Sequence, residues 1–212
     1  MTLRLNGSTS GYTEIDAPAV AGSNTLVLPT GNGSADQALV TNGSGTLSFA
    51  DRGRMVLATA QNSTSGTSID FTGIPSWVKR VTVMLDRVST NGTSVVQLQL
   101  GTGSFTPTTS GYNGLSFISL TGTGSLVTNI TTGMAIMADG SASYSRVGPI
   151  VINNITGNSW SMSWCGGDSA SARVGTAAAT VSLSAALTGI RITTVNGTDT
   201  FDAGSINILM EG

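Results

Sequence analysis

Histidine is absent from the 212-residue chain, and cysteine occurs once. Without histidine the chain lacks the commonest general base and the commonest metal ligand, and a Ser-His-Asp triad is excluded. A single cysteine, Cys165, cannot form an intrachain disulfide, so the fold does not rest on disulfide bonds. Cys165 follows Trp164 in an alternating apolar run, and we expect it to be a small buried or half-buried residue. Pairing between chains or a reactive thiol is the alternative.

Charged residues are also scarce, at 9% of the chain, against about 25% in a typical globular protein. Uncharged Ser, Thr, Asn and Gly must therefore cover much of the surface. The nine basic residues are scattered and the formal net charge is −2. Nucleic-acid binding needs a concentrated positive surface, so we expect no nucleic-acid partner. The only adjacent basic pair, Lys79 and Arg80, is interpreted as a solvated strand end.

Long apolar runs are missing as well. No segment approaches the roughly 18–20 apolar residues of a membrane-spanning helix, so we expect no membrane insertion. The N-terminal residues show no basic region followed by an apolar stretch, so no signal peptide is expected. We expect synthesis in a cytoplasm, followed by retention there or release by another route such as cell lysis.

Helical periodicity is nearly absent, and the 28 glycines interrupt every potential helix at about 1 kcal/mol each relative to alanine. Period-2 alternation takes its place, with one apolar and one polar face, and Asn-Gly dipeptides supply hairpin turns between the strands. The sequence therefore predicts an all-β fold, an antiparallel β-sandwich or barrel. The alternating runs lie at 81–86, 96–100, 159–164, 181–185, 190–194 and 206–210.

Residues 1–50 form a segment that cannot fold alone. Short alternating stretches are separated by Gly, Ser, Asn and Thr, and large apolar residues are few. An isolated hairpin is marginal in water, and ordering each residue costs roughly 1–2 kcal/mol of backbone entropy. Such a segment is either disordered or stabilised by other copies of itself. The regular strand-and-turn punctuation favours the second, which predicts a stalk or docking element.

A charged cluster at 51–54 marks the predicted linker, because three of its four residues are charged. Beyond it the apolar density rises and the strand-like runs lengthen. Residues 55–212 are enough for a domain with its own core. We therefore predict a separate antiparallel β domain there.

The acidic residues show no pattern typical of catalysis. Asp199 and Asp202 are close in sequence and would suit an acid pair or a calcium loop, but their spacing matches no EF-hand. Turn capping is the preferred interpretation. We expect no enzymatic activity, no cofactor and no metal.

The aromatic residues give the only candidate contacts. Trp160 and Trp164 share one strand face, which suits either a sugar-stacking platform or the core; the core is preferred, because the other face is serine. Tyr112 and Tyr144 lie in Gly- and Ser-rich, loop-like contexts, where tyrosine gives contact area at low entropic cost. Tyr112, the adjacent Asn113 and Tyr144 are the candidate receptor-contact residues, and an ordinary half-buried loop tyrosine is the alternative for each tyrosine.

Several segments resemble fibre proteins of tailed bacteriophages, cyanophages included. Together they lie at both ends of the chain and at the start of its second part, and none is a catalytic motif. They are Gly-Ser-Thr-Ser-Gly-Tyr at 7–12, Ala-Pro-Ala at 17–19, Asn-Thr-Leu-Val-Leu-Pro at 24–29, the stretch 37–49, Thr-Ser-Ile-Asp-Phe-Thr-Gly-Ile-Pro-Ser-Trp-Val-Lys-Arg at 67–80, and the stretch 197–208.

The resemblance implies a homotrimeric fibre on the virion, on its tail or capsid surface. Residues 1–50 would attach to other virion or tail proteins, and a jelly-roll-like sandwich at the tip would bind host-surface glycan such as lipopolysaccharide. The chain departs from the family in being short and in lacking a repetitive shaft and a coiled-coil heptad. The alternatives are a capsid decoration or tail-assembly protein without a receptor, and, ranked last, a depolymerase.

Overall fold

The computed structural model describes residues 3–35, 37–51, 53–119 and 124–212. The chain divides into two compact units, Met1–Arg52 and Gly53–Gly212. This division falls within 51–54, the segment predicted to be a linker. The described residues form strands and turns and contain no helix, so the all-β prediction is confirmed.

The first unit consists of two hairpins. Strand β1 (Leu3–Asn6) pairs with β2 (Tyr12–Ile15), and β3 (Gln37–Thr41) pairs with β4 (Leu47–Asp51). None of its residues whose burial is described is buried. Most of its large apolar side chains are more than half exposed, from Leu39 at 51% to Val20 at 92%, and Val40, Leu47 and Phe49 are half-buried. The unit therefore has no core of its own, as the sequence predicted.

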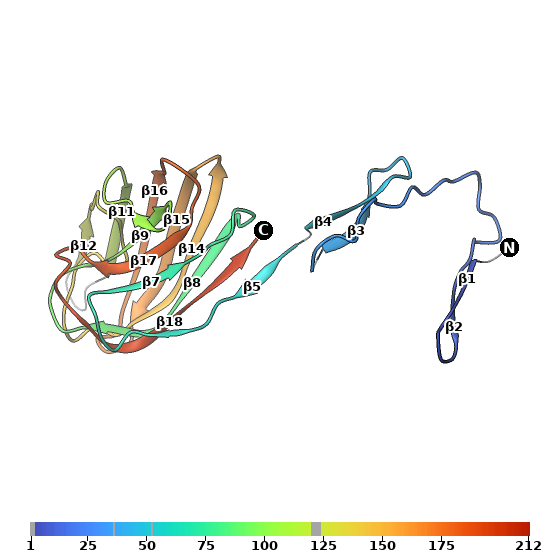
Figure 1. Ribbon diagram of the computed structural model, residues 1–212. Coiled ribbons are helices and arrows are strands. Elements are labelled where there is room, and N and C mark those ends of the chain that lie inside the picture. Colours follow the sequence, from blue (N-terminus) through green and yellow to red (C-terminus); the bar gives the residue numbers. More distant parts are fainter. Residues whose placement is uncertain (1–2, 36, 52, 120–123) are drawn as a thin grey trace. The chain divides into compact units, whose positions relative to one another are not determined.

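The second unit is built from two antiparallel sheets, which confirms the predicted sandwich (Figure 1). The smaller sheet has the order β10 (Thr106–Pro107), β9 (Val96–Thr102), β17 (Gly189–Thr194) and β7 (Ser68–Thr72), with β13 (Met134–Ala135) also beside β9. The larger has the order β12 (Ser125–Thr128), β11 (Asn113–Ser119), β16 (Arg173–Ser182), β15 (Ser159–Asp168), β14 (Arg146–Thr156), β8 (Arg80–Thr90), β18 (Phe201–Glu211) and β5 (Met55–Leu57), with β6 (Gln61–Asn62) also beside β18.

The chain of the second unit passes back and forth between the two sheets, and its first strands pair with its last. Strand β5 pairs with the last strand, β18, and β7 pairs with β17, while β7, β8 and β9 alternate between the sheets. Strands β14, β15 and β16 then widen the larger sheet as a meander. Early and late strands are thus neighbours, which a jelly-roll-like path requires.

The core lies between the sheets and follows the predicted alternation. In β15 the side chains of Trp160, Met162 and Trp164 are 4%, 2% and 1% exposed, so the preferred core interpretation of the tryptophans is confirmed. Burying one large apolar side chain contributes roughly 1.5–3 kcal/mol. Every hydrophobic residue reported as buried lies at or beyond Ile69. The second unit therefore has a core that is its own.

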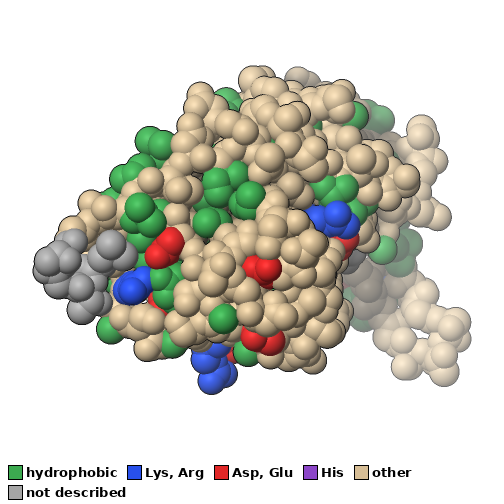
Figure 2. All heavy atoms as spheres, turned by 90° about the vertical axis from the view of Figure 1, so that its left-hand side faces the viewer, with side chains coloured by type: hydrophobic (Ala, Val, Ile, Leu, Met, Phe, Trp, Pro, Cys, Tyr) green, Lys and Arg blue, Asp and Glu red, His purple; other side chains and the backbone are tan. Residues whose placement is uncertain are grey.

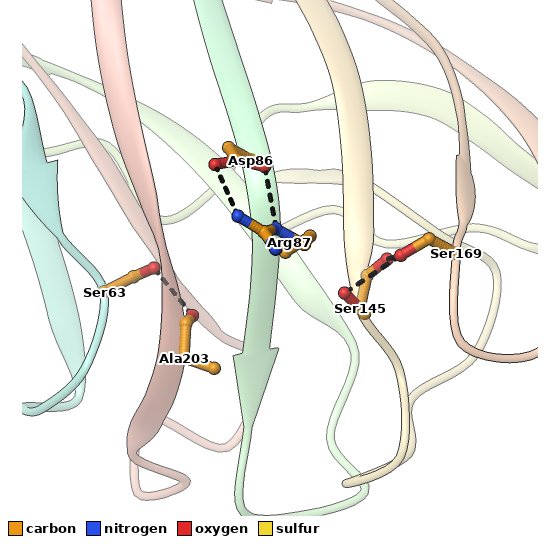
Figure 3. A network of polar contacts seen from close by, with 6 residues as sticks. All are labelled: Ser63, Asp86, Arg87, Ser145, Ser169 and Ala203. Carbon is orange, nitrogen blue, oxygen red and sulfur yellow. Dashed lines mark hydrogen bonds and ion pairs between the residues drawn. The ribbon is translucent and has the colours of Figure 1, made fainter.

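Serine and backbone contacts join neighbouring strands where β8 bulges. Arg87 has a φ of 52°, and the pairing of β8 with β18 shifts opposite Gly204. Ser63 Oγ donates to the carbonyl of Ala203 at 2.9 Å, and Arg87 pairs with its neighbour Asp86 (Figure 3). The Asp86–Arg87 pair is largely exposed, so it contributes little to stability. These contacts hold the strands together around the bulge, so we assign them a structural role.

Uncharged groups dominate the surface, as the composition predicts. On the face of the second unit seen in Figure 2, most atoms belong to backbone or to uncharged polar side chains, and only a few Lys, Arg, Asp or Glu side chains are visible. Lys79 and Arg80 are exposed at the start of β8, which confirms their interpretation as a solvated strand end.

Candidate functional site

The outer side of the smaller sheet carries two rows of polar side chains, which we call the polar face. In one row Arg191 of β17 lies between Asp70 of β7 and Gln99 of β9. In the next row Thr193 lies between Ser68 and Gln97. The rows arise because adjacent antiparallel strands place directly opposed residues on the same side of the sheet.

Asp70 and Arg191 form a two-point ion pair. Arg191 Nε donates to one carboxylate oxygen of Asp70 at 2.8 Å, and Nη2 donates to the other at 2.6 Å. The hydrogen bonding of Arg191 to the Asp70 carboxylate is the main reason why the pKa of Arg191 is raised. This geometry fixes the guanidinium plane. About 30% of each side chain stays exposed (32% for Arg191, 28% for Asp70), so the pair is accessible to a ligand.

The two glutamines are held in place by Thr132. Thr132 Oγ1 donates to Gln97 Oε1 at 2.8 Å, and Gln99 Nε2 donates to the Thr132 carbonyl at 2.8 Å. The alternation of β9 predicts that both glutamines are solvated, but they are 3% and 5% exposed. Thr132 and Gly133 lie against this side of β9, since a Cβ on Gly133 would lie 2.7 Å from Gln97 Oε1, which accounts for the difference.

An aromatic ring closes one end of the polar face. Gly101 and Gly189 are directly paired, and the Phe105 ring lies over both: a Cβ on Gly101 would lie 2.7 Å from the ring, and one on Gly189 would be closer still. The guanidinium carbon of Arg191 lies 5.7 Å from the ring centre. The paired glycines thus make room for a half-buried ring beside the ion pair.

A hollow of about 300 Å³ lies on this face. Its lining includes Gln97, Gln99, Thr109, Thr132, Arg191 and Thr193. Amide, guanidinium and hydroxyl groups offer both donors and acceptors. The described residues contain no cluster suited to a metal ion, and the one carboxylate, Asp70, is committed to Arg191. The arrangement suits the binding of a neutral, hydroxyl-rich ligand.

Of the three residues predicted to contact a receptor, Asn113 is exposed and begins β11. The prediction that Tyr112 and Tyr144 are exposed contact residues is wrong, because they are 2% and 5% exposed. The Tyr112 hydroxyl accepts a hydrogen bond from the Leu100 amide at 2.7 Å. Burial raises the pKa of Tyr112 to about 12, against the opposing effect of that hydrogen bond.

Replacing Tyr112 with phenylalanine is expected to lower the free energy of unfolding at pH 8 by about 1–2 kcal/mol, because the buried Leu100 amide loses its acceptor. The deficit should shrink between pH 10 and 12. Tyr112 holds its proton in the folded protein up to about 12 but releases it near 10 when unfolded, so wild type loses stability as pH rises through this range. Denaturant titrations of wild type and Tyr112→Phe at pH 8 and at pH 12 measure the deficit at each pH.

Tyr12→Phe, at a tyrosine 58% exposed, is the control for Tyr112→Phe. A stability deficit of Tyr112→Phe that does not change with pH would contradict the assignment.

Tyr144 belongs to a charged cluster inside the sandwich. Its hydroxyl donates to Asp139 at 2.8 Å and accepts from Arg173. Arg146 lies with its guanidinium carbon 5.6 Å from the Tyr144 ring, and Asp168 pairs with Arg146 along the strands. The Ser-rich sequence around Tyr144 does not indicate the charged partners that bond its hydroxyl.

Arg146 is the most enclosed member of this charged cluster. It is 0% exposed, and its three guanidinium nitrogens have no hydrogen-bond partner among the described residues. Burial lowers the pKa of Arg146 to about 10, against the opposing charges of Asp168 and Asp139. The cluster contains two cations and two carboxylates, so their formal charges balance. Its position inside the sandwich indicates a structural role.

Two further residues of the sequence can now be placed. Asp199 accepts from the Ser94 amide at 2.9 Å and from Asn196 Nδ2 at 2.6 Å, and the Asn196 bond is the main reason why the pKa of Asp199 is lowered. The turn-capping interpretation is therefore confirmed for Asp199. Cys165 is exposed, so its predicted burial is wrong: it alternates with Trp164 and therefore faces outward with Ser163.

Comparison with protein-family models, with curated proteins and with solved structures returned no significant match. Within the described part of the chain, no helix has the length and apolar character needed to cross a bilayer.

Proposed function

We propose that this protein is a structural fibre protein of a tailed bacteriophage that binds glycan on the host surface through the polar face. The observation that carries the proposal is a hollow of about 300 Å³ lined by Arg191, Gln97 and Gln99, with Arg191 held by Asp70 beside it. Planar amide and guanidinium groups can each bind neighbouring sugar hydroxyls, and Phe105 offers an apolar surface beside them. Asp70 neutralises Arg191, which favours an uncharged saccharide such as the neutral part of a lipopolysaccharide.

The coreless first unit supports the fibre part of the proposal. Its exposed apolar residues need partners, and sister copies or other virion proteins would supply them. A trimer follows from the resemblance to phage fibres. Several weak glycan sites on one particle would raise avidity by roughly 10²–10⁴. No catalytic step is proposed.

Binding of the purified full chain to immobilised lipopolysaccharide tests this function. Wild type is expected to bind and to block adsorption of the phage. Arg191→Gln should weaken single-site binding by about 10-fold or more, because a hydrogen bond to a charged group contributes roughly 1.5–3 kcal/mol. Arg80→Gln is the matched control, since Arg80 also pairs with a carboxylate, Glu211, at 3.5 Å but lies outside the polar face.

Failure of the wild-type protein to bind glycan or to block adsorption would contradict receptor binding. Location on the virion then decides the alternative. Gold-labelled antibody at the tail supports a fibre, whereas label at the capsid surface supports a decoration protein.

A further inference from the structure

The outer side of the larger sheet is a continuous uncharged surface. One row of directly paired residues crosses seven strands: Leu57, Leu209, Thr82, Val151, Ser163, Ala178 and Leu115. The next row along the strands contains Asn207, Met84, Pro149, Cys165, Thr176, Phe117 and Val127. We call these two rows the uncharged face. None of their members carries a charge at neutral pH.

Large apolar side chains are exposed at the two edges of the uncharged face. Leu57 is 61% exposed, Leu115 59% and Val127 56%, and Phe117 is 37% exposed. Charged residues begin only at its margins, with Asp86 beyond one row and the Arg80–Glu211 pair beyond the other. Soluble surfaces normally intersperse charges of both signs. A surface that exposes apolar side chains at its edges and carries no charge is therefore expected to be covered.

The size of the surface fits a protein partner. Seven strands about 4.8 Å apart span roughly 30 Å, and two rows with their side chains cover about 14 Å along the strands. The next rows on β14, β15, β16 and β11 are also uncharged, with Asn153, Ser161 and Thr180 on one side and Val147, Gly167 and Val174 on the other. The total is on the order of 600 Å², close to the roughly 800 Å² that each partner contributes to a stable interface.

The composition of this surface favours a second copy of the same chain. A partner with a charged surface would lose hydration there without gaining an opposite charge. A copy would bring no charge, and its Ser, Thr and Asn groups can donate and accept in return. Most soluble oligomers are built from identical chains. The first unit, which lacks a core, independently needs partners.

We infer that the uncharged face is an interface between the second units of neighbouring copies of this chain. This inference does not depend on glycan binding, because the polar face lies on the other sheet. It also differs from association through residues 1–50, since the contacts lie within Gly53–Gly212.

The single cysteine is a probe already inside the interface. Cys165 is exposed in one copy and lies in the second row, so association should protect its thiol. In the full chain, iodoacetamide, an uncharged reagent, is expected to react with Cys165 at least 10-fold more slowly at high than at low protein concentration. Leu115→Lys and Leu115→Glu should both abolish this protection. A direct electrostatic effect on the thiol would be opposite for the lysine and the glutamate variant. Loss of protection in both variants therefore reports loss of the interface.

Ile155→Lys is the matched control. Ile155 is an exposed apolar residue, at 58%, near the β14–β15 turn and outside the two rows, and its substitution should leave the protection intact. Equal rates at all concentrations, with a monomeric mass by light scattering, would overturn the inference. Protection in the full chain that is lost in a protein of residues 53–212 would overturn it too, because the first unit would then be the occupant. Failure of glycan binding alone would leave it standing.

Discussion

Replacing Asp168 with asparagine is expected to lower the free energy of unfolding by up to about 3–5 kcal/mol, the range for removing one member of a buried charge pair, because the buried Arg146 cation loses the strongest of its opposing charges while Asp139 remains. Arg146 is 0% and Asp168 2% exposed, and each lies opposite the other on paired strands. Asparagine retains an oxygen for the amides of Ser145 and Ala170, which donate to Asp168 Oδ1 at 2.7 and 3.0 Å. The substitution therefore isolates the charge. Urea denaturation at pH 7 measures the loss.

A double-mutant cycle separates charge pairing from packing. Arg146→Met keeps much of the side-chain volume without the cation, so the double variant with Asp168→Asn should be more stable than Asp168→Asn alone. We expect a coupling of about 2 kcal/mol or more, within the range for residues in one polar network. Asp86→Asn, at the exposed pair with Arg87, is the control and should cost less than about 1 kcal/mol. Additive costs in the cycle would show that Asp168 does not act through the Arg146 charge.

Separating the chain at its two units is expected to leave one part folded and the other unfolded. A protein of residues 53–212 should show a single cooperative transition, because every hydrophobic residue reported as buried lies in it. A peptide of residues 1–52 should lack a cooperative transition at micromolar concentration, since two hairpins without buried side chains do not offset the cost of ordering the backbone.

Circular dichroism during heating checks both parts. The isolated peptide is expected to have the spectrum of an unfolded chain, and the 53–212 protein the spectrum of a β protein. Cooperative melting of the dilute peptide would contradict the conclusion that the first unit depends on partners. Loss of the transition in the 53–212 protein would contradict the independence of the sandwich.

Much of the sandwich could be predicted from local alternation. In the Val81–Leu85 part of β8 and the Trp160–Trp164 part of β15, every second residue is apolar and faces the core, because successive side chains point to opposite sides of a strand. The same rule, applied to Cys165, would have placed it outside. Being next to Trp164 in the sequence places Cys165 on the opposite side of the strand.

The candidate site could not be predicted in this way, because it depends on which strands become neighbours. Asp70 and Arg191 are 121 residues apart in sequence, and neither strand indicates its partner. Gln97 and Gln99 alternate as solvated residues do, yet the segment at Thr132 covers them. Tyr112 and Tyr144 failed for the same reason: Gly- and Ser-rich neighbours describe the local chain, whereas a distant amide and a distant arginine fix the two hydroxyls.

The cross-bonded side chains of the polar face also bear on how quickly a ligand could be accommodated there. Arg191, Gln97 and Gln99 already have their orientations fixed by Asp70 and Thr132. Immobilising a flexible side chain on binding normally costs about 0.5–1.5 kcal/mol, and here folding has met that cost in advance. A ligand that reaches the polar face therefore meets side chains that are already in their bound rotamers. Its association rate would be limited by its approach to the surface, and the lifetime of the complex by the contacts it makes.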